Sequence, residues 1–416
     1  MRSAAGQLAA LVATDLLLLW VASSAARRKG LLLFVGGAVA LAFALARRRR
    51  GRPRALLAGS FAILLAAVTV LALEAALVLW PGLLKGRLAN HVLNEYHQGR
   101  TGIYRADPVL GVTFKPDVRK RIYWNGHWWT HEANAHAYRG PALASADAVF
   151  LGDSMIYGHG VETAETVPAR FTRQTRLTAA NLGVQGYCLV QSLALLRQKG
   201  LALRPRWIFV ASHPTDVPDV LHWYERPELE RFLSEEGYLP LVRPELRPRP
   251  PSPFEWWEQQ AALPLRAGRL LGGLARAARD TSAGPQVPSA AEPYFKPAPS
   301  DLDVPFMAAR AEASADDRLA WDTHRRALAE IKRAADLAGA RLVMFDLGYP
   351  REFSLAIGGV AQQLGAAYSP AGRVVLAEAL RGEPMYLAND GHWTPAGCAR
   401  IARELAASGE PDGAGR

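Results

Sequence analysis

The chain has 416 residues, of which 50% are apolar, so it is long enough for a large domain and too apolar for a disordered protein. Its two cysteines, Cys188 and Cys398, exclude a zinc ribbon, an iron–sulfur cluster and a framework of several disulfides. The net charge of +11 would suggest nucleic-acid binding, but ten basic residues and one acidic residue lie in the first 54 positions. The remaining chain is nearly neutral, so no nucleic-acid partner is expected.

Three apolar stretches fill the amino-terminal region, at residues 8–26, 30–46 and 55–80. A helix needs about 20 apolar residues to cross a hydrocarbon core of roughly 30 Å, so residues 1–84 are predicted to form three transmembrane helices. A cleavable signal peptide is the alternative for the first stretch, but three tandem stretches favour retained helices. Basic residues prefer the cytoplasmic side, and the excess at Arg2 and 47–54 predicts that the chain after Trp80 lies outside the cytoplasmic (inner) membrane, in the periplasm or beyond.

Residues 85–146 are rich in aromatic and turn-forming residues and are predicted to form short strands ahead of the main domain. Two interpretations of these aromatic side chains stay open. They pack against the main domain, or they form a face on which sugar rings stack. The aromatic residues are Tyr104, Phe114, Tyr123, Trp124, Trp128, Trp129 and Tyr138.

Alternating strand and helix patterns then extend over residues 147–407. Apolar runs predict strands at 147–151, 177–182, 207–211 and 341–347, with helices near 187–196, 328–338 and 396–407. Repeated strand–helix units of this kind predict an α/β fold, in which helices cover both faces of a parallel sheet and sites form beyond the carboxyl ends of the strands.

A Pro-rich insertion at about 226–313 interrupts this pattern, with twelve prolines between Pro240 and Pro299. The insertion is either a lid that contacts substrate or a solvent-exposed excursion without chemistry. Residues 408–416 contain glycine and proline and are predicted to be a disordered tail.

The sequence Gly152-Asp153-Ser154 directly follows the first predicted strand of the sheet. A serine hydroxyl becomes nucleophilic only when a base removes its proton and nearby donors stabilise the oxyanion. Near the other end of the chain, Asp390 and His392 precede a predicted helix, so His392 is the candidate base and Asp390 the residue that orients its ring. The plain alternative is a capping turn that carries a surface histidine.

Together these pieces resemble the SGNH hydrolases, also called the GDSL esterase and lipase family. Gly152-Asp153-Ser154 resembles the nucleophile block, residues 181–186 (Asn-Leu-Gly-Val-Gln-Gly) the second block, and Asp390 with His392 the last. The resemblance implies a three-layer, flavodoxin-like α/β/α domain at 147–407. It also implies a catalytic triad of Ser154, Asp390 and His392, supported by Asp153, and an oxyanion hole that uses the amides of Ser154 and Gly186.

The third block departs from the family pattern, in which an asparagine donates to the oxyanion. Thr215 stands at that position, within Ser-His-Pro-Thr-Asp, and is expected to contribute its hydroxyl to the oxyanion hole. His213 is an alternative donor. The two-residue spacing between Asp390 and His392, with Trp393 following, is similar to that of polysaccharide O-acetyltransferases of the alginate type.

The segment from Asp107 to Gly140 resembles the lead-in of membrane-tethered bacterial members of the group, and its Arg139 would hold a substrate anion or form a structural ion pair. Cys188 and Cys398 each follow a site block, so they are expected to approach one another, as two buried thiols or as a disulfide. No metal and no cofactor are expected, because phosphate-binding and zinc-binding motifs are absent from the sequence.

The sequence therefore predicts a membrane-anchored serine esterase acting on acyl esters, most simply acetyl esters of a cell-envelope or extracellular glycan. A glycan O-acyltransferase with the same site is the first alternative, and a catalytically impaired glycan-binding or assembly component is the second. The expected partners are an acylated carbohydrate or small ester, the lipid bilayer and proteins of polysaccharide biosynthesis.

Overall fold

The computed structural model describes residues 102–246, 314–388 and 390–409, with parts of 65–93 and residue 270. The chain divides into two compact units, one of residues 1–94 and 250–286 and the other of residues 95–249 and 287–416. In the first unit the structure describes the 3-10 helix η1 (Pro81–Leu83) and α4 (Gly86–Leu93).

Within the described residues, no helix combines the length and the apolar character needed to cross a bilayer. The stretches 8–26 and 30–46, and much of 55–80, lie outside the described residues. The three transmembrane helices therefore stay a prediction. The Pro-rich insertion also lies mostly outside the described residues, and only its start, residues 226–246, is described continuously.

The second unit is built on a five-stranded sheet in the order β6-β5-β7-β8-β9, with all neighbouring pairs parallel. Its strands are β5 (Ala148–Leu151), β6 (Ala179–Asn181), β7 (Trp207–Ser212), β8 (Arg341–Asp346) and β9 (Ala367–Ser369). Because side chains alternate across a strand, Val149 and Leu151 enter one core cluster while Ala148 and Phe150 enter the other. Both faces of the sheet are thus buried, as parallel strands made of continuous apolar runs require.

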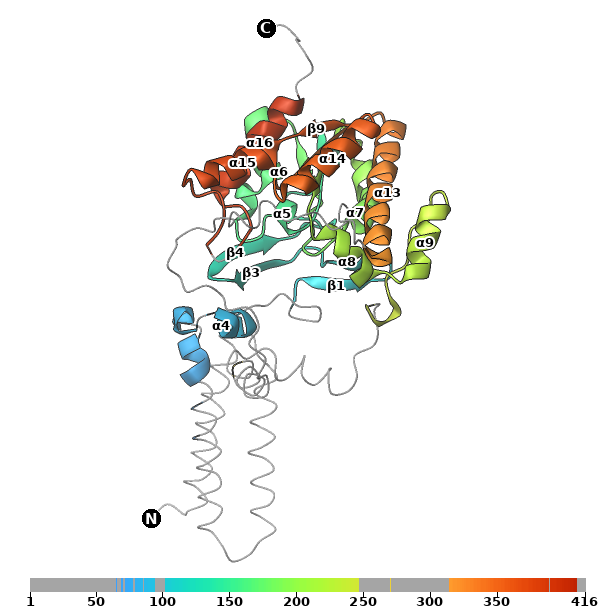
Figure 1. Ribbon diagram of the computed structural model, residues 1–416. Coiled ribbons are helices and arrows are strands. Elements are labelled where there is room, and N and C mark those ends of the chain that lie inside the picture. Colours follow the sequence, from blue (N-terminus) through green and yellow to red (C-terminus); the bar gives the residue numbers. More distant parts are fainter. Residues whose placement is uncertain are drawn as a thin grey trace, which may run out of the picture. The chain divides into compact units, whose positions relative to one another are not determined.

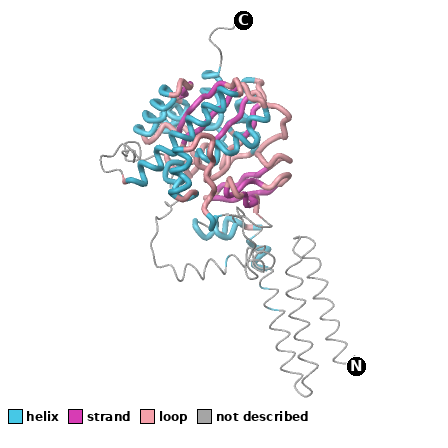
Figure 2. The backbone as a smooth tube through the Cα atoms, turned by 90° about the vertical axis from the view of Figure 1, so that its right-hand side faces the viewer, coloured by secondary structure: helices cyan, strands magenta, loops and turns pink. Residues whose placement is uncertain are grey.

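Helices cover each face of this sheet (Figures 1 and 2). One core cluster contains side chains from α7 (Leu189–Leu195), α8 (Asp216–Trp223), α9 (Arg226–Ser234), α13 (Ala315–Leu337) and α14 (Arg351–Gln363). The other contains side chains from α5 (Ser154–Tyr157), α6 (Val167–Thr175), α15 (Ala371–Leu380) and α16 (Pro395–Gly409). The predicted three-layer α/β arrangement is confirmed.

Short helical turns complete this unit: η2 (Thr163–Glu165), the π-helical turn η3 (Leu196–Gly200), η4 (Leu201–Leu203) and η5 (Pro244–Leu246). Local sequence signals fix several helix ends. Helix α13 begins at a capping box in which the Ser314 hydroxyl accepts from the Asp317 amide, and the chain leaves it at Gly339, whose φ is +66°.

Two antiparallel hairpins precede the sheet, β1 (Tyr104–Asp107) with β2 (Gly111–Phe114) and β3 (Arg119–Trp124) with β4 (His127–Glu132). The second hairpin turns at Asn125-Gly126, both with positive φ, which is the turn that this dipeptide favours. Trp129 and Phe114 are fully buried in the core cluster that these hairpins share with the sheet. For these two rings the structure supports packing over sugar stacking.

The two cysteines lie on opposite faces of the sheet, because Cys188 belongs to one core cluster and Cys398 to the other. Both thiols are free and buried, and burial raises the pKa of each to about 12. The expectation that they approach one another across the cleft is therefore wrong, and the interpretation as two buried thiols is confirmed. Helix α16 continues through Gly409, so the predicted tail begins later than residue 408.

Candidate active site

Ser154 is the first residue of α5, immediately beyond the carboxyl end of β5. A tight turn places it there, because Gly152 has φ +150° and a Cβ at this position would lie 2.8 Å from Ile156 Cγ1. Asp153 caps the short helix by accepting a hydrogen bond of 2.9 Å from the Met155 amide. This carboxylate fixes the turn that presents the serine, which is the supporting position expected for it.

His392 and Asp390 meet Ser154 from a segment more than two hundred residues later in the chain. The Nε2 atom of His392 lies 2.6 Å from the Ser154 hydroxyl, and its Nδ1 atom is hydrogen-bonded to Asp390 Oδ1. Burial opposes ionisation of Asp390, but the hydrogen bond and the charge interaction with His392 outweigh it and lower the pKa of the carboxyl well below its ordinary value. Since Asp390 is an acceptor, Nδ1 carries the ring proton and Nε2 is left to accept the serine proton.

A second histidine, which the sequence did not predict as a site residue, packs against these three side chains. The ring of His159 stacks on the ring of His392 with centroids 4.2 Å apart, and its Nε2 atom lies 3.8 Å from Asp390 Oδ2. Burial and the neighbouring His392 lower the pKa of His159 well below its ordinary value, so a neutral ring backs the candidate base. The sequence signal was Gly158-His159-Gly160, directly after the nucleophile helix.

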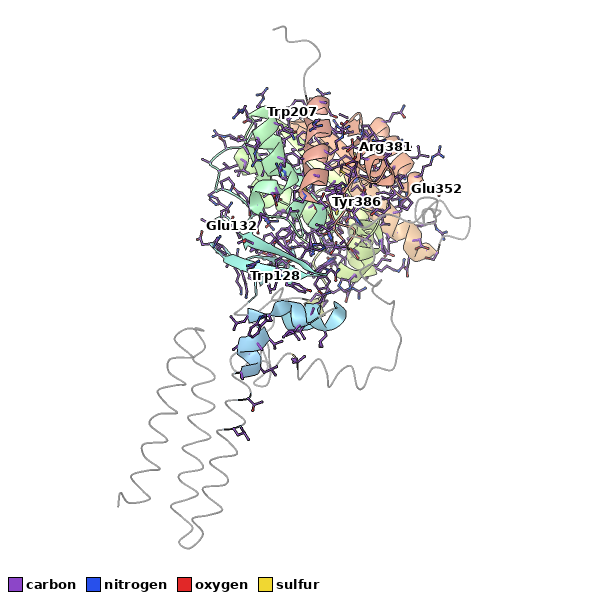
Figure 3. The ribbon with its side chains drawn as sticks, turned by 90° about the vertical axis from the view of Figure 1, so that its left-hand side faces the viewer. Trp128, Glu132, Trp207, Glu352, Arg381 and Tyr386 are labelled. Carbon is purple, nitrogen blue, oxygen red and sulfur yellow. The ribbon has the colours of Figure 1, made fainter. Side chains whose placement is uncertain are left out.

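The β3–β4 hairpin reaches the same corner of the site. Asn125 Nδ2 donates to Asp390 Oδ2 at 3.3 Å, and His127 Nε2 donates to the Ala388 carbonyl at 2.7 Å. In Figure 3 the labelled Trp128 of this hairpin lies far from the labelled Trp207, with which β7 begins. The hairpin thus lies at the carboxyl end of the strands, where it holds the loop that carries the acid of the triad.

Arg139 is buried and holds the segment that carries His159. Its guanidinium donates to the carbonyls of Tyr157 at 2.7 Å, Gly158 at 2.6 Å and Val161 at 2.6 Å, and to that of Thr130 at 3.0 Å. These partners are backbone carbonyls, so among the described residues Arg139 serves neither a structural ion pair nor an open anion site.

Residues 181–186, the block predicted to supply an oxyanion amide, begin at the end of β6. Val184 N donates to the Gly152 carbonyl at 3.2 Å, which ties this loop to the turn before the serine. Gly186 has φ +73°, and its carbonyl accepts from Trp223 Nε1 at 2.9 Å. The Gln185 side chain accepts a hydrogen bond from the Tyr104 hydroxyl, so the β1–β2 hairpin braces this loop as the other hairpin braces Asp390.

Thr215 precedes α8 at the end of β7 and is exposed. Its hydroxyl lies 2.7 Å from His213 Nδ1, and its amide donates to the same nitrogen at 3.1 Å. The hydroxyl that was expected to serve the oxyanion hole therefore already has a partner. The structure gives Thr215 a contact with His213 in place of the free donor that the family pattern would put at this position.

His159, Asp390 and His392 also place potential metal-ligand atoms within 4.8 Å of one another. Within the parts of the chain that the structure describes, this is the one group of three or more His, Cys, Asp or Glu residues with such spacing. His392, however, uses both ring nitrogens in hydrogen bonds with Ser154 and Asp390. The arrangement fits a proton-transfer triad better than a cation site.

The predicted blocks follow the strands of the sheet in the order that the resemblance to SGNH hydrolases implies. A parallel sheet in this strand order carries Gly152-Asp153-Ser154 after β5, the oxyanion loop after β6, the altered third block after β7, and Asp390 with His392 before α16. The hydrogen bonds from His392 to Ser154 and Asp390 join the first and last of these blocks.

Comparison with known proteins found no matching family model and no matching curated protein. Among solved structures, the domain is similar to one described as a G-D-S-L family lipolytic protein from Desulfitobacterium hafniense, at 10% identity, covering 64% of this chain and 99% of that chain, with a TM-score of 0.33. It is also similar to the acetylxylan esterase Axe2 from Geobacillus stearothermophilus, at 11% identity, covering 65% and 96%, with a TM-score of 0.32. The similarity to alginate-type acetyltransferases stays a prediction.

Proposed function

We propose that the protein is a membrane-anchored serine esterase that acts outside the cytoplasmic membrane on acyl esters, with an acetylated cell-envelope or extracellular glycan as its substrate. The observation that carries the esterase activity is the hydrogen-bonded series Ser154–His392–Asp390, in which the serine hydroxyl lies 2.6 Å from an imidazole nitrogen. A partly buried series of this kind is the arrangement that makes a serine nucleophilic.

These contacts support a serine-esterase reaction in two stages. His392 Nε2 takes the proton of Ser154 as the serine oxygen attacks the acyl carbonyl, and Asp390 stabilises the imidazolium that forms. The amides of Ser154 and Gly186 hold the oxyanion of the tetrahedral intermediate. Collapse of this intermediate expels the alcohol, to which His392 returns the proton, and leaves an acyl-enzyme on Ser154. Water, activated by the same imidazole, then releases the acid and restores the serine.

The membrane anchor rests on the three apolar stretches at 8–26, 30–46 and 55–80 and on the placement of the arginines that flank them. The glycan substrate rests on the aromatic hairpin beside the triad. Trp124, which is partly exposed, lies edge-on to His159 with ring centroids 6.3 Å apart. An aromatic ring at the rim of the site is the kind of surface on which a sugar stacks.

The proposal is tested by covalent labelling and by ester hydrolysis. A fluorophosphonate probe is expected to label the wild-type protein and not Ser154→Ala, and the same substitution should lower kcat for a small acetyl ester by about 10⁴-fold or more. Equal labelling of both proteins, or no labelling of a well-folded wild type, would refute the esterase. Ser234→Ala, on the exposed end of α9, is the matched control and should behave as wild type.

Transfer to a sugar hydroxyl, in place of water, would make the same acyl-enzyme an O-acyltransferase. Incubation with an acetyl ester, with and without an oligosaccharide acceptor, separates the two reactions: release of acetate alone supports the esterase, and an acetylated acceptor supports the transferase.

The non-catalytic binding component is favoured by one observation, the hydrogen bond between the Thr215 hydroxyl and His213. Probe labelling of Ser154 would exclude that alternative.

A further inference from the structure

His213 directly follows β7, one of the two strands that pair with the nucleophile strand β5. Strands β5 and β7 are paired in parallel up to Leu151 and Val210, and Ser154 and His213 each lie three residues beyond that pair. The ring of His213 is close enough to Asp153 and His392 for their charges to act on it. His213 is therefore at the same edge of the sheet as Ser154, in the block where the family pattern has its third oxyanion donor.

The hydrogen bonds around His213 determine which ring nitrogen carries the proton. The Thr215 amide is a backbone N–H and can only donate, so His213 Nδ1, which it contacts at 3.1 Å, is an acceptor. A neutral imidazole with an acceptor at Nδ1 carries its hydrogen on Nε2. Burial is the largest of the effects that lower the pKa of His213, and it favours the neutral ring.

The backbone beneath this ring is also fixed. The His213 amide donates to Asp216 Oδ2 at 2.8 Å, and the Asp216 amide donates to the His213 carbonyl at 3.0 Å. These reciprocal bonds tie the end of β7 to the start of α8. A donor fixed before reaction costs no reorganisation when the oxyanion forms, which is the condition for effective stabilisation.

We propose that His213 is the third oxyanion donor of this site, presenting its Nε2–H to the tetrahedral intermediate on Ser154, and that Thr215 is a positioning residue that fixes the His213 tautomer. This inference rests on the proposed serine esterase. The imidazole donates a hydrogen bond and transfers no proton, so the triad alone carries the proton chemistry. His213 and Thr215 together thus replace the family's asparagine: His213 supplies the hydrogen-bond donor, and Thr215 holds its ring.

Substitutions at His213 separate hydrogen-bond donation from a structural role. His213→Ala should lower kcat for a small acetyl ester by about 10²- to 10³-fold with little change in KM, because the donor acts on the transition state. His213→Gln restores an N–H donor and should recover activity to within about tenfold of wild type. Equal losses in the Ala and Gln variants, or a kcat for His213→Ala within about threefold of wild type, would overturn the inference. The exposed His136→Ala is the control and should retain wild-type activity.

A spectroscopic measurement decides the tautomer without reference to activity. In a ¹H–¹⁵N spectrum of the histidine rings, assigned with His213→Gln, the His213 proton should be on Nε2 and its signal should shift when a phosphonate occupies Ser154. A proton on Nδ1, or a signal unchanged by the adduct, would overturn the inference. A wild type that is inactive on all esters and unreactive with the probe refutes the esterase instead, and leaves the tautomer measurement valid.

Discussion

The two sides of the candidate site differ in how closely they keep the residue types of the family pattern. On the proton-transfer side, Ser154, His392 and Asp390 keep the residue types of the family pattern and are joined by hydrogen bonds. On the predicted oxyanion side, the third block has Thr215 where asparagine is expected. The Thr215 hydroxyl is hydrogen-bonded to the His213 ring. Proton transfer needs a base and an acid of matched chemistry, whereas an oxyanion needs only a well-placed donor. We therefore expect the second side to tolerate a change of residue type that the first does not.

Removing the charge of Asp390 should give the largest effect on the proton-transfer side after loss of the nucleophile. Asp390→Asn keeps the size of the side chain but loses the carboxylate that holds the proton on His392 Nδ1, so kcat should fall by about 10³- to 10⁴-fold. Steady-state kinetics on a small ester measures this fall. Asp322→Asn, on an exposed part of α13, is the control. A loss of less than about tenfold would mean that the triad does not control the rate.

The sequence was sufficient for the parts of the fold that rest on long apolar runs. The strands at 148–151, 207–212 and 341–346 follow their predictions within a residue, because buried parallel strands are almost continuously apolar. Strand β9 (Ala367–Ser369) has three residues and no such pattern, so it was missed. The two cysteines were misplaced for a different reason: nearness in sequence to two site blocks does not determine which face of the sheet a side chain enters.

The sequence also named the residues of the triad, which the structure brings together, while their catalytic roles stay a prediction. It did not point to the groups that hold them. Asn125 contacts Asp390 across 265 positions of sequence, and His159 stacks on His392 because two loops pack together. Contacts of this kind depend on tertiary packing and leave no periodic signal in the sequence. The only hints were an Asn-Gly turn and a Gly-His-Gly segment.

The stacked His159 gives an intermediate effect that sharpens the comparison. His159→Ala removes the ring against which His392 rests, and kcat should fall by about 10- to 100-fold through misplacement of the base. His159→Phe keeps a ring and should lose less, if stacking is what positions His392. Because the pKa of His159 lies well below its ordinary value, the pH–rate profiles of wild type and His159→Phe should have the same shape near neutrality. If the pH dependence of kcat near neutrality disappears in His159→Phe, then His159 itself titrates near neutral pH.

The smallest predicted effect concerns stability on the oxyanion side. Asp216 is buried, and burial, followed by repulsion from Asp153, raises the pKa of its carboxyl well above its ordinary value of about 3.8. The native state therefore keeps this proton at pH values where the unfolded chain has lost it, so this group's contribution to stability falls as pH rises above about 3.8. Asp216→Asn removes the titration and keeps an oxygen that accepts from the His213 amide.

Thermal unfolding of wild type and Asp216→Asn, measured from about pH 4 to pH 8, tests this sign. The midpoint of the variant should rise relative to wild type as pH increases through that interval, because only the wild type must take up a proton on folding or bury a second negative charge beside Asp153. Asp322→Asn should show no such trend, since its side chain is exposed. A constant difference between Asp216→Asn and wild type across the interval would mean that Asp216 ionises normally, and that the rigid turn beneath His213 carries a full buried charge.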